Sequence, residues 1–145
     1  MTYGDKLTRN DVYEAIKFDR DFHVLVRSAL GETRGGSPAN AKNVIFTVLN
    51  RVRKQREAWG KNIWEVCFKP KQYSYWDATG LDYLSYYYVK ATIIPAIEAI
   101  EEWRKGKDPT NGATHYHTHE ILPGWAKGHK PCFEDDMHKF YNNVY

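Results

Sequence analysis

The residue best suited to acid–base chemistry is Glu32, which lies in the stretch Gly31 to Gly36 (GETRGG). An apolar run ending at Leu30 predicts a helix before it, and Ser37 followed by Pro38 predicts the start of another helix. The carboxyl group therefore falls at a helix end, beside glycines that let a backbone or a ligand approach closely. Apolar surroundings would raise its pKa and keep it protonated as a general acid. A lone glutamate at a helix end is more often solvated or capping, so this spacing alone does not establish catalysis.

Three histidines, His115, His117 and His119, alternate with other residues near the end of the chain. Residues 114–119 read as a strand, and alternate side chains of a strand point to the same face. Imidazoles on one face could ligate zinc, although no recognised zinc spacing is present and a fourth ligand is needed. The alternative is a polar wall of a binding groove, in which one histidine hydrogen-bonds to substrate or backbone.

Polar and aromatic residues also alternate at Gln72, Ser74 and Trp76. Two hydrogen-bonding side chains and an indole on one edge suit a sugar ring and its amide, while aromatic packing explains the pattern nearly as well. No nucleophile-elbow sequence supports a Ser/His/Asp hydrolase. Cys67 lies in an apolar run and is expected to be buried and inert, and two free cysteines, Cys67 and Cys132, are the default expectation.

Composition narrows the class of protein. A chain of 145 residues is long enough for one compact domain with a real core, so a single catalytic domain over residues 1–145 is expected. Aromatic residues make up 15% of the chain, which suits either a groove that stacks flat ligands or an aromatic core. The net charge of +3 favours an anionic polymer as the partner. The chain has no dense block of Lys and Arg, which argues against nucleic acid. No membrane span or signal peptide is expected.

The elements that must position these residues are mainly helical. The clearest periodic signal is the apolar stripe from Ala41 to Val52, which predicts a central core helix whose basic residues lie on a solvated face. Asn62 is expected to cap a short helix, and Leu81 to Lys105 reads as a long helix that Pro95 kinks or breaks. Residues 138–141 could return as a strand that pairs with the segment around His115. The expected basic residues of the solvated face are Lys42, Arg51, Arg53, Lys54 and Arg56.

Taken together, these stretches resemble the SleB-type cell-wall hydrolases, the family of spore cortex-lytic enzymes and related phage and bacterial proteins. The resemblance rests on five segments that occur in the family's order and cover roughly Phe22 to Tyr141. The segments are Gly31–Gly35, Val48–Val52, Lys71–Trp76, Gly112–His117 and His138–Tyr141.

The resemblance implies an α+β, mainly helical fold of the lysozyme-like, lytic transglycosylase type, with a small β element near the C-terminus. It implies that Glu32 is the catalytic acid, and that peptidoglycan glycan strands are the substrate. Thr33 stands where many relatives carry alanine, a change expected to have little effect. Other residues would line the substrate groove: Gln72, Tyr73, Ser74, Trp76, Thr114, His115 and Tyr116.

Three hypotheses for function follow. The leading one is an enzyme that cleaves the bond between N-acetylmuramic acid and N-acetylglucosamine, as a lytic transglycosylase or as a muramidase, without a cofactor. A non-catalytic glycan-binding module is the second, and a metal-dependent enzyme using His115, His117 and His119 is the third. The protein is expected to act as a monomer, without nucleic-acid or membrane partners, and to reach the wall after release during phage lysis, from a virion or on a spore.

Overall fold

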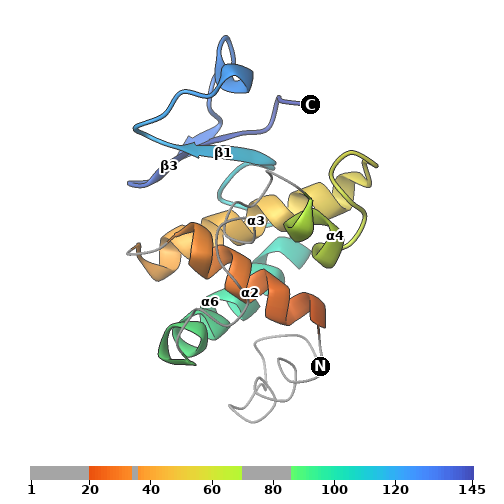
Figure 1. Ribbon diagram of the computed structural model, residues 1–145, viewed down its shortest axis with the longest axis vertical. Coiled ribbons are helices and arrows are strands. Elements are labelled where there is room, and N and C mark those ends of the chain that lie inside the picture. The colour runs from red at the N-terminus through yellow and green to blue at the C-terminus, as the bar shows by residue number, and fades with distance from the viewer. Residues whose placement is uncertain (1–19, 34–35, 70–85) are drawn as a thin grey trace.

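Figure 1 shows the computed structural model of the protein, which describes residues 20–33, 36–69 and 86–145. Within these residues, helices come first along the chain and a small sheet comes last. The helices are α2 (Arg20–Glu32), α3 (Pro38–Lys54), α4 (Ile63–Phe68) and α6 (Tyr86–Arg104). The strands are β1 (His115–Thr118), β2 (Phe133–Glu134) and β3 (His138–Tyr141), with a 3-10 helix, η1 (Gly124–Ala126), between β1 and β2.

The central element is α3, and its start follows from local sequence. The Ser37 hydroxyl accepts a hydrogen bond from the Asn40 amide at 3.3 Å, and the Asn40 side chain accepts one from the Ser37 amide at 2.8 Å. Pro38 occupies the first turn, where its missing N–H costs no helical hydrogen bond. The predicted cap and the predicted helix are therefore both confirmed.

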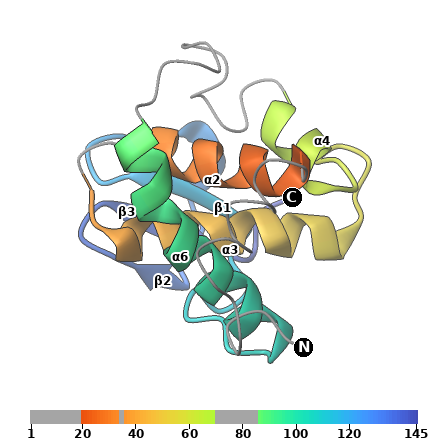
Figure 2. The same cartoon turned by 90° about the horizontal axis from the view of Figure 1, so that it is seen from below.

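The apolar stripe of α3 forms the core of the helical body. Val44, Ile45 and Phe46 are 0% exposed, and each such side chain contributes roughly 1.5–3 kcal/mol relative to an exposed position. The helix packs against α2, α4 and α6, and Figure 2 shows α6 running across α2 and α3. The core therefore sits where these helices cross.

Pro95 lies inside α6, and the helix continues through it from Tyr86 to Arg104. The sequence pattern predicts a kink or a break at Pro95, and the prediction of a break is wrong. Ile93, Ala96 and Ile97, on either side of the proline, are buried in the core. Their packing offsets the helix penalty of an interior proline, which is about 3 kcal/mol.

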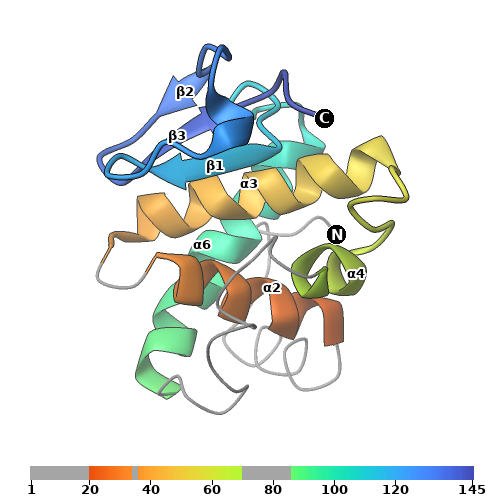
Figure 3. The same ribbon diagram turned by 45° about the horizontal axis from the view of Figure 1, so that its top comes forward.

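The opposite face of α3 is polar and also largely buried. The expectation that the basic residues are solvated is wrong for Arg51, whereas Arg53 and Lys54 are exposed as expected. Arg51 is 4% exposed and Asn50 is 0% exposed. Asn40 and Asn43 donate to Asp136 and Asp135 at 2.7 and 2.9 Å. Figure 3 shows the reason, since α3 lies between α2 on one side and the sheet on the other.

The sheet has the order β1-β3-β2, with both pairs antiparallel. In the β1–β3 pair, His115 lies opposite Tyr141 and Thr118 lies opposite His138. The predicted pairing of the two C-terminal segments is therefore confirmed, whereas β2, only two residues long, is an addition. A turn before β1 is held by Asp108, which accepts hydrogen bonds from the Thr110 amide and the Gly112 amide at 2.8 and 2.9 Å.

Candidate functional site

Glu32 is the last residue of α2, so its predicted place at a helix end is confirmed. Its side chain is half-buried. The next residue, Thr33, is buried, and its hydroxyl donates to the Ala29 carbonyl at 2.7 Å. This bond satisfies one of the carbonyls at the helix end. The threonine that departs from the family pattern is therefore accommodated by the last turn of the helix that carries the candidate acid.

Tight backbone packing follows at Gly36, whose amide donates to the Thr33 carbonyl at 2.7 Å. A Cβ atom added there would lie 2.7 Å from the Asn40 side-chain oxygen and 2.9 Å from the Thr33 carbonyl oxygen. Both distances are too short for real carbon atoms, so only glycine fits this position. At Gly36 the expected close approach is therefore made to the Thr33 carbonyl and the Asn40 side chain.

The surroundings of Glu32 include a buried thiol. The pKa of the Cys67 thiol is raised to about 12, chiefly by burial and to a smaller extent by the negative charge of Glu32. The same thiol is influenced by the positive charge of Arg51. Cys67 is therefore inert as a nucleophile, as predicted, and it lies within electrostatic reach of both the carboxylate and the buried guanidinium.

Thr114 immediately precedes β1 and is 1% exposed. Its amide donates to the Tyr141 carbonyl at 2.9 Å, and its carbonyl accepts from the Arg51 Nε atom at 2.5 Å. Its hydroxyl lies 2.9 Å from the His115 Nδ1 atom. The residue thus joins α3, β3 and the His115 ring, and its contacts within the described residues are those of a positioning residue.

His115 is held between two indoles. Its ring centroid lies 5.4 Å from that of Trp59 and 5.2 Å from that of Trp125. The pKa of His115 is lowered to about 4, chiefly by burial and also by the positive charges of Arg51 and Arg56. The imidazole is therefore neutral near pH 7 and can offer a hydrogen bond to an uncharged ligand.

Tyr116 points away from these two indoles, as alternation along a strand requires. Its ring packs against the core of the helical body and lies 4.9 Å from the His138 ring. The structure therefore separates the predicted residues Thr114, His115 and Tyr116, because of these three only the His115 ring meets both Trp59 and Trp125. The other predicted substrate residues, Gln72, Tyr73, Ser74 and Trp76, lie outside the described residues.

The alternative zinc site does not form within the residues that the structure describes. No group of three or more His, Cys, Asp or Glu side chains there could hold a metal ion. His117 contacts the Tyr141 hydroxyl and the Thr118 carbonyl, each at 2.7 Å, while His119 lies past the end of β1, 2.8 Å from the Asp135 carbonyl. The three histidines thus have separate partners, and this alternative is wrong for the described part of the chain.

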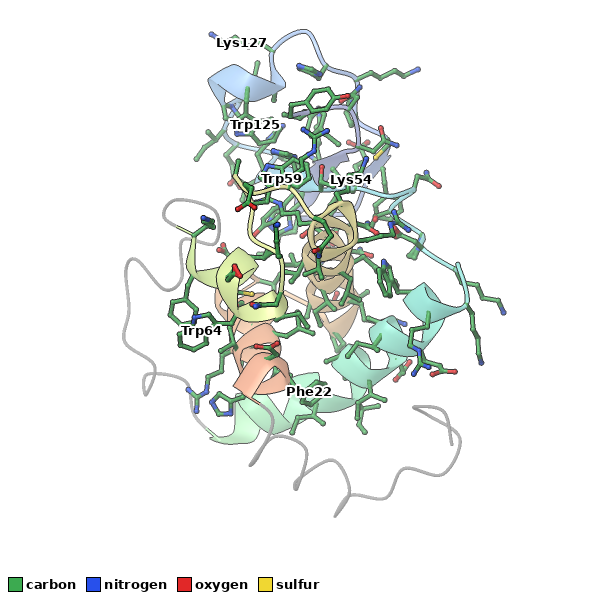
Figure 4. The ribbon with its side chains drawn as sticks, turned by 90° about the vertical axis from the view of Figure 1, so that its right-hand side faces the viewer. Phe22, Lys54, Trp59, Trp64, Trp125 and Lys127 are labelled. Atoms are coloured by element: carbon green, nitrogen blue, oxygen red, sulfur yellow. The ribbon has the colours of Figure 1, made fainter. Side chains whose placement is uncertain are left out.

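The sequence interpretation missed an aromatic cluster at this end of the sheet. The Trp125 ring lies 5.3 Å from the Tyr141 ring and 5.8 Å from the His117 ring, and Trp125 itself is 36% exposed. Figure 4 places Trp125 and Trp59 near each other where the sheet meets the helical body. A signal for this cluster was present in the sequence: Trp125 places a large indole between Gly124 and Ala126, in a segment interpreted as a loop. We call Trp59, His115, His117, Trp125 and Tyr141 the aromatic cluster.

Both described cysteines are free: Cys67 is buried and Cys132 is half-buried. The Cys132 thiol donates to the Thr110 carbonyl at 3.2 Å. The default expectation of two unpaired cysteines is confirmed, although only Cys67 belongs to the core.

The chain belongs to the Cell Wall Hydrolase family, whose profile matches residues 36–141. The matched range begins just after Glu32, so the match does not itself include the candidate acid.

Among solved structures, the fold is similar to the catalytic domain of the SleB protein of Bacillus cereus. The two share 23% sequence identity with a TM-score of 0.60, over 83% of this chain and 88% of the other. The predicted fold class, a mainly helical, lysozyme-like α+β fold with a small C-terminal β element, is confirmed. No curated protein matches the sequence. Within the described residues, every helix is too short or too polar to cross a membrane.

Proposed function

We propose that this cell-wall hydrolase cleaves the β-1,4 bond between N-acetylmuramic acid and N-acetylglucosamine in peptidoglycan, with Glu32 as its general acid and base. The observation that carries the proposal is the half-buried Glu32 carboxyl at the end of α2, in a chain whose following residues match the family. A general acid must be protonated, and burial is a general means by which proteins favour the protonated form of a carboxyl.

The proposed chemistry is that of a lytic transglycosylase. Protonated Glu32 donates its proton to the bridging oxygen, and the bond from that oxygen to the muramoyl C1 atom breaks. The resulting carboxylate takes the proton of the muramoyl 6-hydroxyl, whose oxygen bonds to C1 and closes a 1,6-anhydro ring. One carboxyl group therefore serves both steps, whereas a hydrolytic glycosidase usually needs a second carboxyl and a water molecule.

The substrate surface in this proposal combines His115 with the predicted residues Gln72, Tyr73, Ser74 and Trp76. Buried Thr114 positions the His115 ring, and Tyr116 packs against the helical core instead. The neutral His115 ring supplies a hydrogen bond to an uncharged sugar amide, and the exposed indole of Trp125 supplies an apolar plane for a sugar ring. Proton transfer accounts for roughly 10²–10⁴-fold of the acceleration. Contacts that orient and distort the sugar must supply the rest.

The test is the Glu32→Gln variant assayed on purified sacculi. The variant keeps the size of the side chain but has no proton to donate, so we expect activity to fall by at least about 100-fold while the circular dichroism spectrum is unchanged. Mass spectrometry of wild-type products separates the chemistries, because anhydro ends indicate a transglycosylase and reducing muramic acid ends indicate a muramidase. Full activity of the variant would refute the role of Glu32.

A further inference from the structure

Arg56, just beyond the end of α3, is held against two aromatic rings. Its guanidinium carbon lies 4.9 Å from the centroid of Trp59 and 4.0 Å from the centroid of Tyr145. Trp59 is 5% exposed, whereas Arg56 is half-buried. Cation–π contacts of this kind restrict a flexible side chain without using its N–H groups. The guanidinium is therefore positioned, and its hydrogen-bond donors remain available.

Within the described residues, Arg56 has neither an ion pair nor a side-chain hydrogen bond. Three lysines behave differently, since Lys42, Lys61 and Lys105 each lie within 4.0 Å of a glutamate. Arg51, one turn earlier, donates to the Thr114 carbonyl. A guanidinium that is held in place without an anion is suited to receive one from a ligand.

The neighbourhood of Arg56 is positively charged. The pKa of His115 is lowered by burial and then by the charges of Arg51 and Arg56. These two arginines come from α3 and from the loop after it, so two parts of the chain bring positive charge to one place. An anionic group that reached the aromatic cluster would be attracted there.

We propose that Arg56 binds a carboxylate carried by the side chain of muramic acid in the glycan strand. This inference rests on the proposed function, because it takes the same polymer as the substrate. The planar fork of N–H donors in arginine matches a carboxylate in a bidentate arrangement, which the point charge of lysine cannot do. Two sources offer this chemistry: the stem peptide in intact strands, and the lactyl group once the peptide has been removed.

The experiment measures binding rather than cleavage, in a Glu32→Gln background that keeps the strands intact. Three soluble substrates are compared by fluorescence anisotropy: peptide-bearing strands, strands denuded by an amidase, and denuded strands whose lactyl carboxylates have been converted to amides. Only the third lacks carboxylates. The first two distinguish the peptide from the lactyl group as the source.

We expect Arg56→Gln to raise the Kd about tenfold, or about 1.4 kcal/mol, for at least one carboxylate-bearing substrate relative to the amidated one. Arg56→Lys should give a smaller increase, because it keeps the charge and loses the fork. The matched control is Arg53→Gln, which removes the same charge from an exposed position on α3 near the Trp103 ring. That control should leave all three Kd values within twofold.

Two results would overturn the inference: unchanged binding of both carboxylate-bearing substrates by Arg56→Gln, or an equal loss on all three. Wild-type protein that binds with the expected preference and cleaves none of the strands would instead count against the proposed chemistry alone. The two proposals therefore fail in distinguishable ways.

Discussion

Replacing Arg51 with methionine tests how the helical body holds the sheet. The Arg51 Nε atom donates to the Thr114 carbonyl at 2.5 Å, and the two residues are 4% and 1% exposed. Methionine keeps most of the apolar stem and removes every donor. The change therefore leaves a buried carbonyl without its charged partner.

The magnitude follows from that contact. A hydrogen bond to a charged group contributes about 1.5–3 kcal/mol, and an unpaired buried carbonyl costs about 1–3 kcal/mol. Both figures describe the loss of the same hydrogen bond and are not added together. We therefore expect the free energy of unfolding to fall by about 2–3 kcal/mol. At about 2–4 °C per kcal/mol for a chain of this size, Tm should drop by about 4–12 °C.

The assay is urea denaturation followed by circular dichroism, with Arg53→Met as the matched control. Arg53 lies on the same helix and is exposed, so the same substitution there should change stability by no more than about 0.5 kcal/mol. A second measurement uses NMR: removal of the Arg51 charge should raise the pKa of His115 in the variant. Equal stability of the two variants would show that the buried guanidinium does not hold the strand.

Two further predictions concern a glycine and a histidine. Gly60 has φ of +103°, and an added Cβ would lie 2.8 Å from Val66 N, so Gly60→Ala should cost more than about 2 kcal/mol in urea denaturation. Gly106→Ala, with φ of +77° and nothing within 4 Å, should cost only about 1 kcal/mol. An NMR titration of His115 should give a pKa of about 4, below its ordinary 6.5. Between pH 6.5 and pH 4 the unfolded chain binds a proton at His115 that the folded chain does not, so the free energy of unfolding should fall as the pH drops through this range. The fall should be at most about 3 kcal/mol. A titration midpoint of His115 near 6.5 would contradict the burial of the ring.

The helices and the strand pair were predictable because their signals are local. Ser37 and Pro38 mark the start of α3, and alternation of polar and aromatic residues marks β1. Both signals act within a few residues, so one sequence contains all of the information. The break expected at Pro95 was wrong because packing of distant residues decides whether a weakened helix survives.

The buried polar face of α3 could not be predicted in the same way. A stripe of asparagine and arginine reads as a solvated face until the segment that covers it is known. The partners of Asn43 and Asn50 are Asp135 and Asp108, which lie far along the chain. Only the fold identifies these residues as an interface.

In the candidate site too, local sequence predicted some features and not those that depend on distant segments. The place of Glu32 at a helix end followed from the glycines and the cap after it, whereas its catalytic role stays a prediction. The pairing of His115 with Trp59 and Trp125 depends on three separate segments that meet only in the folded chain. For this reason the aromatic content of the chain indicated a stacking groove or an aromatic core but did not identify the residues that form a site.

The hydrogen-bonded seam between α3 and the sheet has a consequence for the response to temperature. The apolar core around Val44 and Ile45 gains its stability from the hydrophobic effect, which weakens on cooling. The contacts made by Asn40, Asn43 and Arg51 bury polar surface instead, and polar and apolar surface contribute to the heat capacity of unfolding with opposite signs. In the cold, the joint between sheet and helices therefore keeps its strength better than the helical core does.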